Sequence, residues 1–595
     1  MDKEKDIVIK RFKDCKTARQ EYTPLWKDVQ CYVAPSKIIK DFFEDETSRS
    51  EQKDVYINDP TAYISVVQAA DYLLGIIWGN GNNVFQIEPS RYVKDLLTDE
   101  NELDEFFKWQ STQILEEMNH SESGFINALK SHLQDQQTFG TSGIGTYIND
   151  DFVENKAQNA LSFNRYGVYN SCIDEGANGK INVVFSVHNW RVSRIVDTFA
   201  VINDELDKGL LAKLPEEIQK AYEAGNYNQK FKIVHGVMPH SEYSIGKIGK
   251  NGTKFKGFWF YEAEQNIFAE EFYQEMPIAM CRAIKIPDEE YGSSSGILAI
   301  SSIKMLNYIT GNTIEAIEKL VGPAFGMFSG ALANGSIIDT SANEINVFNG
   351  KAADGNPMFK ISDVGDISGS VNLLIPKAER DITTIFKIDQ LLDFNNSTQM
   401  TATESLQRFS IRAKSLAGMI QQQKNELLIP MIKRAISLLS SLKLLGVNPE
   451  ENKEQADKLI ELQKSNQVIP EEVLQVIKEG KPYYTIKFNN ELDQMEKSEQ
   501  YDAFTKFILL YSQLLQLDPS LQMGVKSFNM LEYGKNTVNL GNEDFMLSEN
   551  DYNKAVEAQQ QAQQDMMKLE AENKASGTIK NMAGAEKDAR QSQAQ

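Results

Sequence analysis

The sequence predicts an α+β protein that is predominantly helical and is built from several substructures. Its 595 residues exceed what one hydrophobic core usually organises. Apolar residues recur at helical spacing near the start and again after residue 292, whereas between about 140 and 290 they alternate with a period of two. With 41% hydrophobic and 25% charged residues, the composition is that of a soluble globular protein rather than a disordered one.

Residues 1–140 are expected to be mainly helical. The stretch TAYISVVQAADYLLGIIWG places apolar side chains on one helix face, and a loop and the short strand pattern VFQIEP follow it. The predicted members of that face are Tyr63, Val66, Val67, Ala70, Leu73 and Leu74.

Residues 141–290 are expected to form a β-rich part. Phe231, Ile233 and His235 alternate with lysines and smaller residues, which predicts a strand and makes His235 a core histidine. Farther on, the turn signal GKNGT precedes KFKGFWFY, a predicted hairpin arm. The fragment Gly143-Ile144-Gly145 lacks the third glycine of a nucleotide-binding loop, so we expect a turn there.

Helix is expected to return in residues 291–322. An apolar stripe there stops before Gly322-Pro323, which predicts a helix of roughly 28 residues and about 42 Å. Residues 323–370 are rich in Gly, Ala, Ser, Asn and Asp with short strand-like pieces, and a second helical pattern occupies 371–394. The stripe of the first helix consists of Ile300, Ile303, Leu306, Ile314, Ile317 and Leu320.

A polar run then interrupts the helical pattern. Thr401 and Glu404 have the spacing of a capping box, so a new, very long helix should start there, within residues 402–500. Pro430 should kink it, because the proline ring removes one hydrogen bond and clashes one turn back. Residues 501–550 contain a shorter amphipathic helix, and 551–595 form a polar tail that is a solvated helix or disordered.

The charge of the chain constrains its partners. A formal net charge of −22 argues against a protein that binds nucleic acid over its whole surface. The charge is consistent with a surface along which a polyanion slides, and equally with a charge that only keeps the protein soluble. The predicted long helix is an exception, because residues 402–434 contain six basic residues and only two acidic ones. Two of the six, Arg408 and Arg412, share a face that could contact DNA phosphates, an acidic neighbour or only solvent.

The sequence offers no basis for catalysis, a cofactor or a metal. There is no P-loop, no GxSxG motif and no HExxH motif, and the serines 293–295 have no recognisable partner base. Four scattered cysteines without a CxxC pair fit a reducing compartment. The first ten residues, MDKEKDIVIK, are charged and lack an h-region, so no secretion signal is expected. The uncharged stretch 320–338 is too weakly hydrophobic for a membrane span, so no membrane partner is expected. We therefore do not expect an enzyme.

Two segments resemble the portal, or head-to-tail connector, proteins of short-tailed double-stranded DNA bacteriophages. The first is EMPIAMCRAIKIPDEEYGSSSGILAISSIKMLN, similar to the family segment in which a strand and an Arg lead through Tyr-Gly into the first stem helix. The second is TATESLQRFSIRAKSLAGMIQQQKNELLIPMIKRAISLL, similar to the family's Thr-Ala-Thr-Glu helix. The order of parts from about residue 10 to 445 also matches, whereas residues 446–595 carry no family motif.

This resemblance implies a portal fold assembled as a ring of twelve copies. The wing would comprise a helical part, 1–140, and a β-rich part, 141–290, joined later by the long kinked helix and the helices that follow it, 402–500. Two stem helices, 291–322 and 371–394, would flank a small α/β clip, 323–370. A tunnel loop would occupy residues 395–401. A helical crown would occupy residues 501–550, and a flexible or helical tail would follow in 551–595. The stem residues implied to pack between subunits are Gly292, Ser295, Gly296, Ile300, Ile303 and Leu306.

The resemblance also implies a function without chemistry of its own. During assembly in the host cytoplasm, the ring would nucleate the capsid with major capsid and scaffolding proteins and would dock the terminase large subunit. It would then bind the tail adaptor and internal core proteins. In the virion it would lie at one capsid vertex. Double-stranded DNA would pass non-specifically during packaging and ejection. The residues implied to face DNA are Asn395, Asn396, Ser397, Thr398 and Gln399 of the tunnel loop, and the cations Lys304, Lys319, Lys377, Lys387, Arg408 and Arg412.

Two other interpretations stay open at this point. One is a nucleotide-using packaging enzyme, which the missing P-loop disfavours. The other is a different virion or scaffold protein built on long helices, which would lack the β-rich part and the order of helix, clip and helix.

Overall fold

A computed structural model describes most of the first of two compact units, Met1–Asn490 and Glu491–Gln595. Every described helix and strand lies in the first unit, because residue 508 alone is described in the second. The described residues are 2–34, 57–79, 84–96, 100–153, 156–176, 178–202, 205–243, 252–329, 341, 343–349, 358–360, 368–387, 418–453, 458–459, 465–489 and 508.

The largest hydrophobic core joins the beginning of this unit to its end. Its N-terminal contributors are α3 (Thr61–Trp78), β1 (Phe85–Pro89), α4 (Arg91–Lys94), α5 (Glu100–Asn119) and α6 (Phe125–Phe139). Its C-terminal contributors are η2 (Lys424–Leu428), α16 (Ile429–Ser441), α18 (Glu471–Lys478) and β15 (Tyr484–Phe488). Two short turns lie beside it: η1 (Ser121–Ser123) joins α5 to α6, and η3 (Ser465–Gln467) contacts α5. The strands β1 and β15 pair antiparallel, with Phe85 opposite Phe488, which ties the two ends of the unit together.

Helix α3 is the one helix in the described part that is long and apolar enough to cross a membrane. It is also a packing helix, since Val66, Ala70 and Leu73 are buried in the cores. The predicted face of this helix was partly wrong, because Tyr63 is 40% exposed whereas Ile77 and Trp78 are buried.

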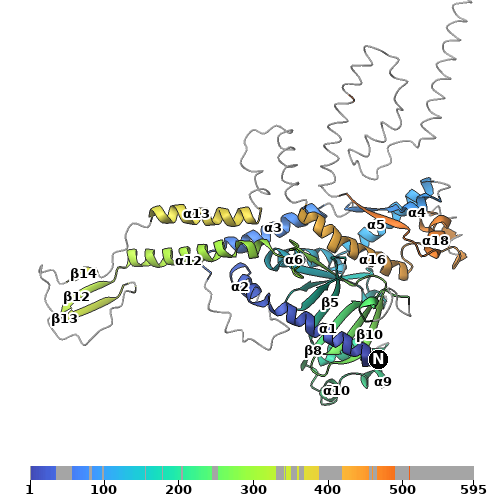
Figure 1. The fold of residues 1–595 in the computed structure, drawn as a ribbon, viewed down its shortest axis with the longest axis horizontal. Coiled ribbons are helices and arrows are strands. Elements are labelled where there is room, and N and C mark those ends of the chain that lie inside the picture. Colours follow the sequence, from blue (N-terminus) through green and yellow to red (C-terminus); the bar gives the residue numbers. More distant parts are fainter. Residues whose placement is uncertain are drawn as a thin grey trace, which may run out of the picture. The chain divides into compact units, whose positions relative to one another are not determined.

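The strands expected between 141 and 290 form two antiparallel sheets (Figure 1). One has the order β10-β9-β8-β5-β4 and the other β11-β2-β3. The strands of the first are β4 (Ser171–Glu175), β5 (Ile181–Arg191), β8 (Lys230–Pro239), β9 (Phe255–Tyr261) and β10 (Asn266–Tyr273), and those of the second are β2 (Thr141–Ile148), β3 (Leu161–Gly167) and β11 (Ile278–Arg282).

The larger sheet is buried on both faces. Val8 and Phe12 of α1 (Asp2–Gln20) pack on one face, and α8 (Val192–Ala200) and α10 (Glu216–Glu223) pack on the other. The predicted hairpin arm is confirmed, since β8 and β9 pair antiparallel. The turn predicted at Gly143–Gly145 is wrong, because these residues lie within β2, the middle strand of the smaller sheet. Short elements complete this region: α7 (Asp150–Val153), β6 (Val201–Ile202), β7 (Glu205–Leu206), α9 (Lys208–Leu211) and α11 (His240–Tyr243).

Helix α12 (Ser295–Val321) confirms the long helix expected after Gly292. It lies beside α13 (Ser368–Ile385), and the chain between them carries a three-stranded sheet (Figure 1). In that sheet β12 (Phe325–Ser329) pairs parallel with β13 (Ile345–Asn349) and antiparallel with β14 (Met358–Lys360). Helix α13 ends at Ile385, earlier than the predicted 394, and Lys387 follows with a left-handed φ of 59°.

The predicted break near Pro430 takes the form of a π-helical turn. Residues 424–428 form η2 immediately before α16, which has Pro430 in its first turn. Because proline cannot donate a backbone hydrogen bond and clashes with the preceding turn, a widened turn relieves the helix there.

Candidate connector site at the α12–α13 helix pair

Helix α12 begins in a crowded junction made by its own chain. A Cβ atom on Gly292 would lie 2.8 Å from the Gly140 carbonyl oxygen and 2.8 Å from Cβ of Arg282. The Ser294 hydroxyl accepts a hydrogen bond from the Ile297 amide at 2.9 Å and donates one to the Thr138 carbonyl at 2.8 Å. The small residues are therefore explained by the close approach of α12 to the end of α6.

A buried arginine fixes the strand that precedes this junction. Arg282 of β11 is fully buried; its Nε lies 3.2 Å from Glu426 Oε1, and its Nη2 donates to the same oxygen at 2.5 Å and to the Gly179 carbonyl at 3.0 Å. Its Nη1 donates to Glu175, and this hydrogen bond holds the pKa of Glu175 below its usual value. Since Glu426 lies in the π-helical turn that leads into α16, the network links this turn to the strand before α12.

The buried face of α12 packs within the same chain. Ala299, Ile303 and Leu306 belong to a core that also contains Ala378 and Ile382 of α13 and Phe386 just after it. Residues of α3 and of α2 (Thr23–Val33) complete this core. Ser295 and Gly296 are buried as well, and Ile300 is partly buried. Of the six positions predicted to pack between subunits, Gly292 also lies in the crowded junction within the chain. Packing between subunits through these six positions stays a prediction.

Other apolar residues of α12 are uncovered. The face that carries Ile303 and Leu306 continues at helical spacing through Ile314 and Ile317, which are 45% and 51% exposed. Leu320 and Val321 extend it, and a second group on another side of the helix comprises Leu298, Met305 and Tyr308, which is 70% exposed. A soluble monomer rarely exposes so many large apolar side chains on one helix. Ile314, Ile317 and Leu320 belong to the apolar stripe predicted from the sequence, but the stripe alone did not indicate that these side chains are exposed.

The predicted cations occupy different environments. Lys304 is paired with Asp28 at 2.7 Å and lies over the Tyr32 ring, so it is held against α2. Lys319 is half-buried in the last turn of α12, Lys377 is exposed on α13, and burial lowers the pKa of Lys387. Arg408, Arg412 and the tunnel-loop residues Asn395–Gln399 lie outside the described residues.

Chemical sites are not evident in the described part of the chain. No group of three His, Cys, Asp or Glu there could hold a metal ion. His132 and His235 are buried, and burial lowers their pKa values to about 4 and about 3. His235 stacks on Trp259 with ring centroids 4.1 Å apart, as expected of a core histidine.

Comparison with known proteins agrees with a structural role. The family model of the bacteriophage head to tail connecting protein matches residues 5–464. The chain therefore belongs to this family, whose members are structural portal components of the phage particle.

Individual relatives are distant. The "Probable portal protein" of Bordetella phage BPP-1 is 22% identical over 457 residues, which cover 75% of this chain and 77% of that protein. Among solved structures, a chain in the virion of a native gene transfer agent particle aligns at 9% sequence identity and a TM-score of 0.27. The alignment covers 72% of this chain and 91% of that chain. The neck of the empty particle, with C6 symmetry, aligns over the same shares at 10% identity and a TM-score of 0.30. These scores are too low to add an argument about this fold.

Proposed function

We propose that this chain is a portal protein that forms a ring, expected to contain twelve copies, around a DNA channel at one capsid vertex. The observation that supports it most is the uncovered apolar surface of α12, with Leu298, Tyr308 and Ile317 all more than half exposed. Neighbouring copies standing side by side would remove this surface from water, which is the main favourable contribution to association.

The charge distribution suits a channel that passes DNA without holding it. The chain is acidic, with 62 basic and 84 acidic residues, so its surface repels a duplex on average. Lysines on the helix pair, such as Lys319 and Lys377, would provide weak compensating sites, and the polar tunnel loop 395–401 would lie nearest the DNA. Phosphate contacts of this kind carry no sequence information, so passage would be non-specific.

The partners follow from the family role. During assembly in the host cytoplasm the ring would nucleate the capsid together with major capsid and scaffolding proteins, and the sheet β12–β14 of the clip would dock the terminase large subunit. Afterwards the clip would bind the tail adaptor, internal core proteins would contact the ring, and DNA would leave through the same channel. ATP hydrolysis would belong to the terminase.

The ring is tested by placing a charge on the exposed face of α12. Ile317→Asp should leave the fold intact, because the side chain is already half exposed, but should prevent rings, because the carboxylate would be buried between copies. Ile477→Asp in α18 is the matched control, since Ile477 is 43% exposed and receives the same charge.

Light scattering coupled to size exclusion and negative-stain images would measure assembly, and circular dichroism would check the fold. Rings formed equally well by Ile317→Asp would refute the role of this face. A wild-type protein that stays monomeric under assembly conditions would refute the proposed ring itself.

A further inference from the structure

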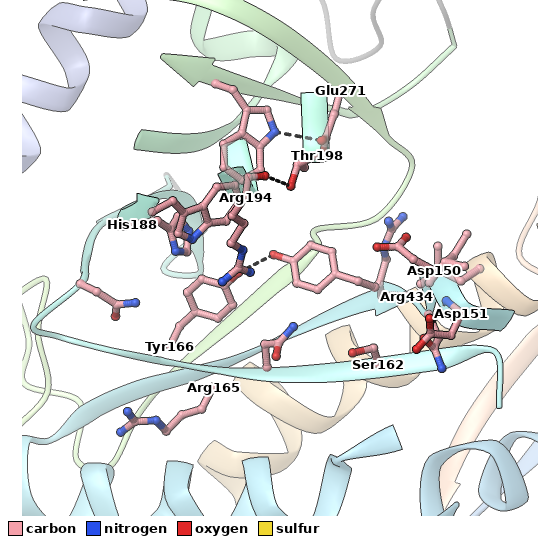
Figure 2. Close-up of a pocket in the computed structure, with 18 residues that line it drawn as sticks. Asp150, Asp151, Ser162, Arg165, Tyr166, His188, Arg194, Thr198, Glu271 and Arg434 are labelled. Carbon is pink, nitrogen blue, oxygen red and sulfur yellow. Dashed lines mark hydrogen bonds between the residues drawn. The ribbon is translucent and has the colours of Figure 1, made fainter. Parts of the chain in front are cut away.

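A pocket of about 770 Å³ opens between the two sheets and α16, away from the α12–α13 pair (Figure 2). Its volume is in the range that holds a small organic ligand. Aromatic side chains form much of its lining, including Tyr147, Tyr166, Trp190 and Trp259. Asparagine, serine and threonine side chains supply further hydrogen-bonding groups. Neither the family nor the proposed ring gives this pocket a role.

The most unusual group in the lining is Arg434 of α16. It is only 8% exposed, yet within the described part of the chain no carboxylate forms an ion pair with it, and its Nε has no hydrogen-bond acceptor. Its guanidinium lies 5.1 Å from the centroid of the Tyr273 ring. A buried cation without a direct partner is costly, and proteins usually satisfy such a group or use it.

A second cation lines the same pocket. Arg194 of α8 lies over the Trp190 ring at 4.4 Å, and no ion pair joins it to another described residue. The third arginine of the lining differs, because Arg165 is paired with Asp135 and stacks on Tyr169. Two guanidinium groups without an ion pair to a described residue therefore line one pocket (Figure 2).

The carboxylates of the lining are already engaged or exposed. Glu271 accepts a hydrogen bond from Trp259 Nε1 at 2.9 Å and another from the Tyr273 hydroxyl. Burial raises the pKa of Glu271, while the Trp259 hydrogen bond and the charge of Arg434 act in the opposite direction. Asp150 and Asp151 are exposed residues at the start of the short helix α7. Burial lowers the pKa of Arg434, and Tyr147, Glu271 and Glu275 act in the opposite direction.

We propose that this pocket binds a small organic oxyanion, a carboxylate or a phosphate monoester. The oxyanion would take its hydrogen bonds from Arg434 and Arg194, while its carbon body would lie against the aromatic lining. Guanidinium groups match planar carboxylates and phosphates in geometry, and such charge-assisted hydrogen bonds are about twice as strong as neutral ones. Binding would give Arg434 the partner that the chain itself does not provide.

Calorimetric titration of the full-length protein tests this proposal. The probes are phenyl phosphate and phenylacetate, which carry the same ring on different oxyanions, and benzyl alcohol as the uncharged analogue. We expect saturable binding of one or both anions and at least about tenfold weaker binding of benzyl alcohol. Binding of phenyl phosphate alone would identify a phosphate ligand, and binding of phenylacetate alone a carboxylate ligand.

Variants locate the binding. Arg434→Met and Arg194→Met should each weaken anion binding about tenfold or more, whereas Arg191→Met should leave it within about twofold. Arg191 is an exposed arginine three positions from Arg194 that does not line the pocket. Arg434→Met should melt at the wild-type temperature or above, because it removes an unpaired buried charge. Arg194→Met, at an exposed position, provides the test if Arg434→Met does not fold.

Two results would overturn the proposal. One is the absence of binding of either anion to the wild type at about 1 mM. The other is equal affinity in the wild type, Arg434→Met and Arg194→Met, which would place any binding elsewhere.

Discussion

The Arg282 network allows a sharp test of what holds the start of α12 in place. We consider Glu426→Gln, which removes one charge from the network with almost no change in volume. Arg282 is fully buried and the Glu426 side chain is 8% exposed, so the guanidinium cannot recover hydration when its partner becomes neutral. Breaking a buried ion pair from one side costs about 3–5 kcal/mol. Because Glu175 and the Gly179 carbonyl remain as partners, we expect the lower end, about 3 kcal/mol.

A matched control separates this effect from the loss of any surface ion pair. Lys443 and Glu451 form a pair at 3.1 Å whose side chains are 75% and 60% exposed, so Glu451→Gln should cost at most about 1 kcal/mol. Urea unfolding followed by far-UV circular dichroism at neutral pH would compare the two variants with the wild type. If Glu426→Gln loses no more stability than Glu451→Gln, Arg282 does not depend on Glu426 and the reasoning fails.

Two further predictions concern pH and the tunnel loop. Burial holds the pKa values of His132 and His235 at about 4 and about 3, below the ordinary 6.5, so the unfolded chain binds more protons between these limits. Burial also lowers the pKa of His188, to about 4. Stability should therefore fall as the pH drops from about 6.5 to about 4, by up to about 1.4 kcal/mol per pH unit for each of the three histidines. His235→Phe should remove about a third of this slope in unfolding measured against pH, and an unchanged slope would argue against a neutral buried His235. Deletion of Asn395–Gln399 should leave rings intact but reduce DNA packaging or retention in an in vitro packaging assay, and normal packaging would remove the tunnel-loop assignment.

Part of the fold could be predicted from local patterns. The period of two in KFKIVHGV indicated a strand, and the spacing of Ile303, Leu306 and Ile317 indicated a helix, because each pattern follows directly from backbone geometry. Pro430 marked the break in the long helix for the same local reason, since its ring is incompatible with a regular turn. The two quoted segments also carried the family, which the match over residues 5–464 shows.

Local sequence patterns could not predict which residues a side chain contacts, or whether it is buried. From the sequence, Gly292 and Ile303 were expected at contacts between subunits, whereas the tertiary structure gives both of them partners inside one chain. A helical stripe indicates that a face is apolar, but it does not indicate which element covers that face. On α12 the face is covered at Ile303 and Leu306 and left open at Ile314 and Ile317.

The sequence by itself determined the main helices and strands, although not strand β2 at Gly143–Gly145, and it determined the order of helix, small sheet and helix, and the family. Only the tertiary structure decided that Arg282 joins Glu426 across 144 positions, that β15 returns to pair with β1, and that Arg434 is buried without an ion-pair partner among the described residues. The physical reason is that backbone periodicity is a local property, whereas burial and ion pairing depend on residues far apart in the chain meeting in space.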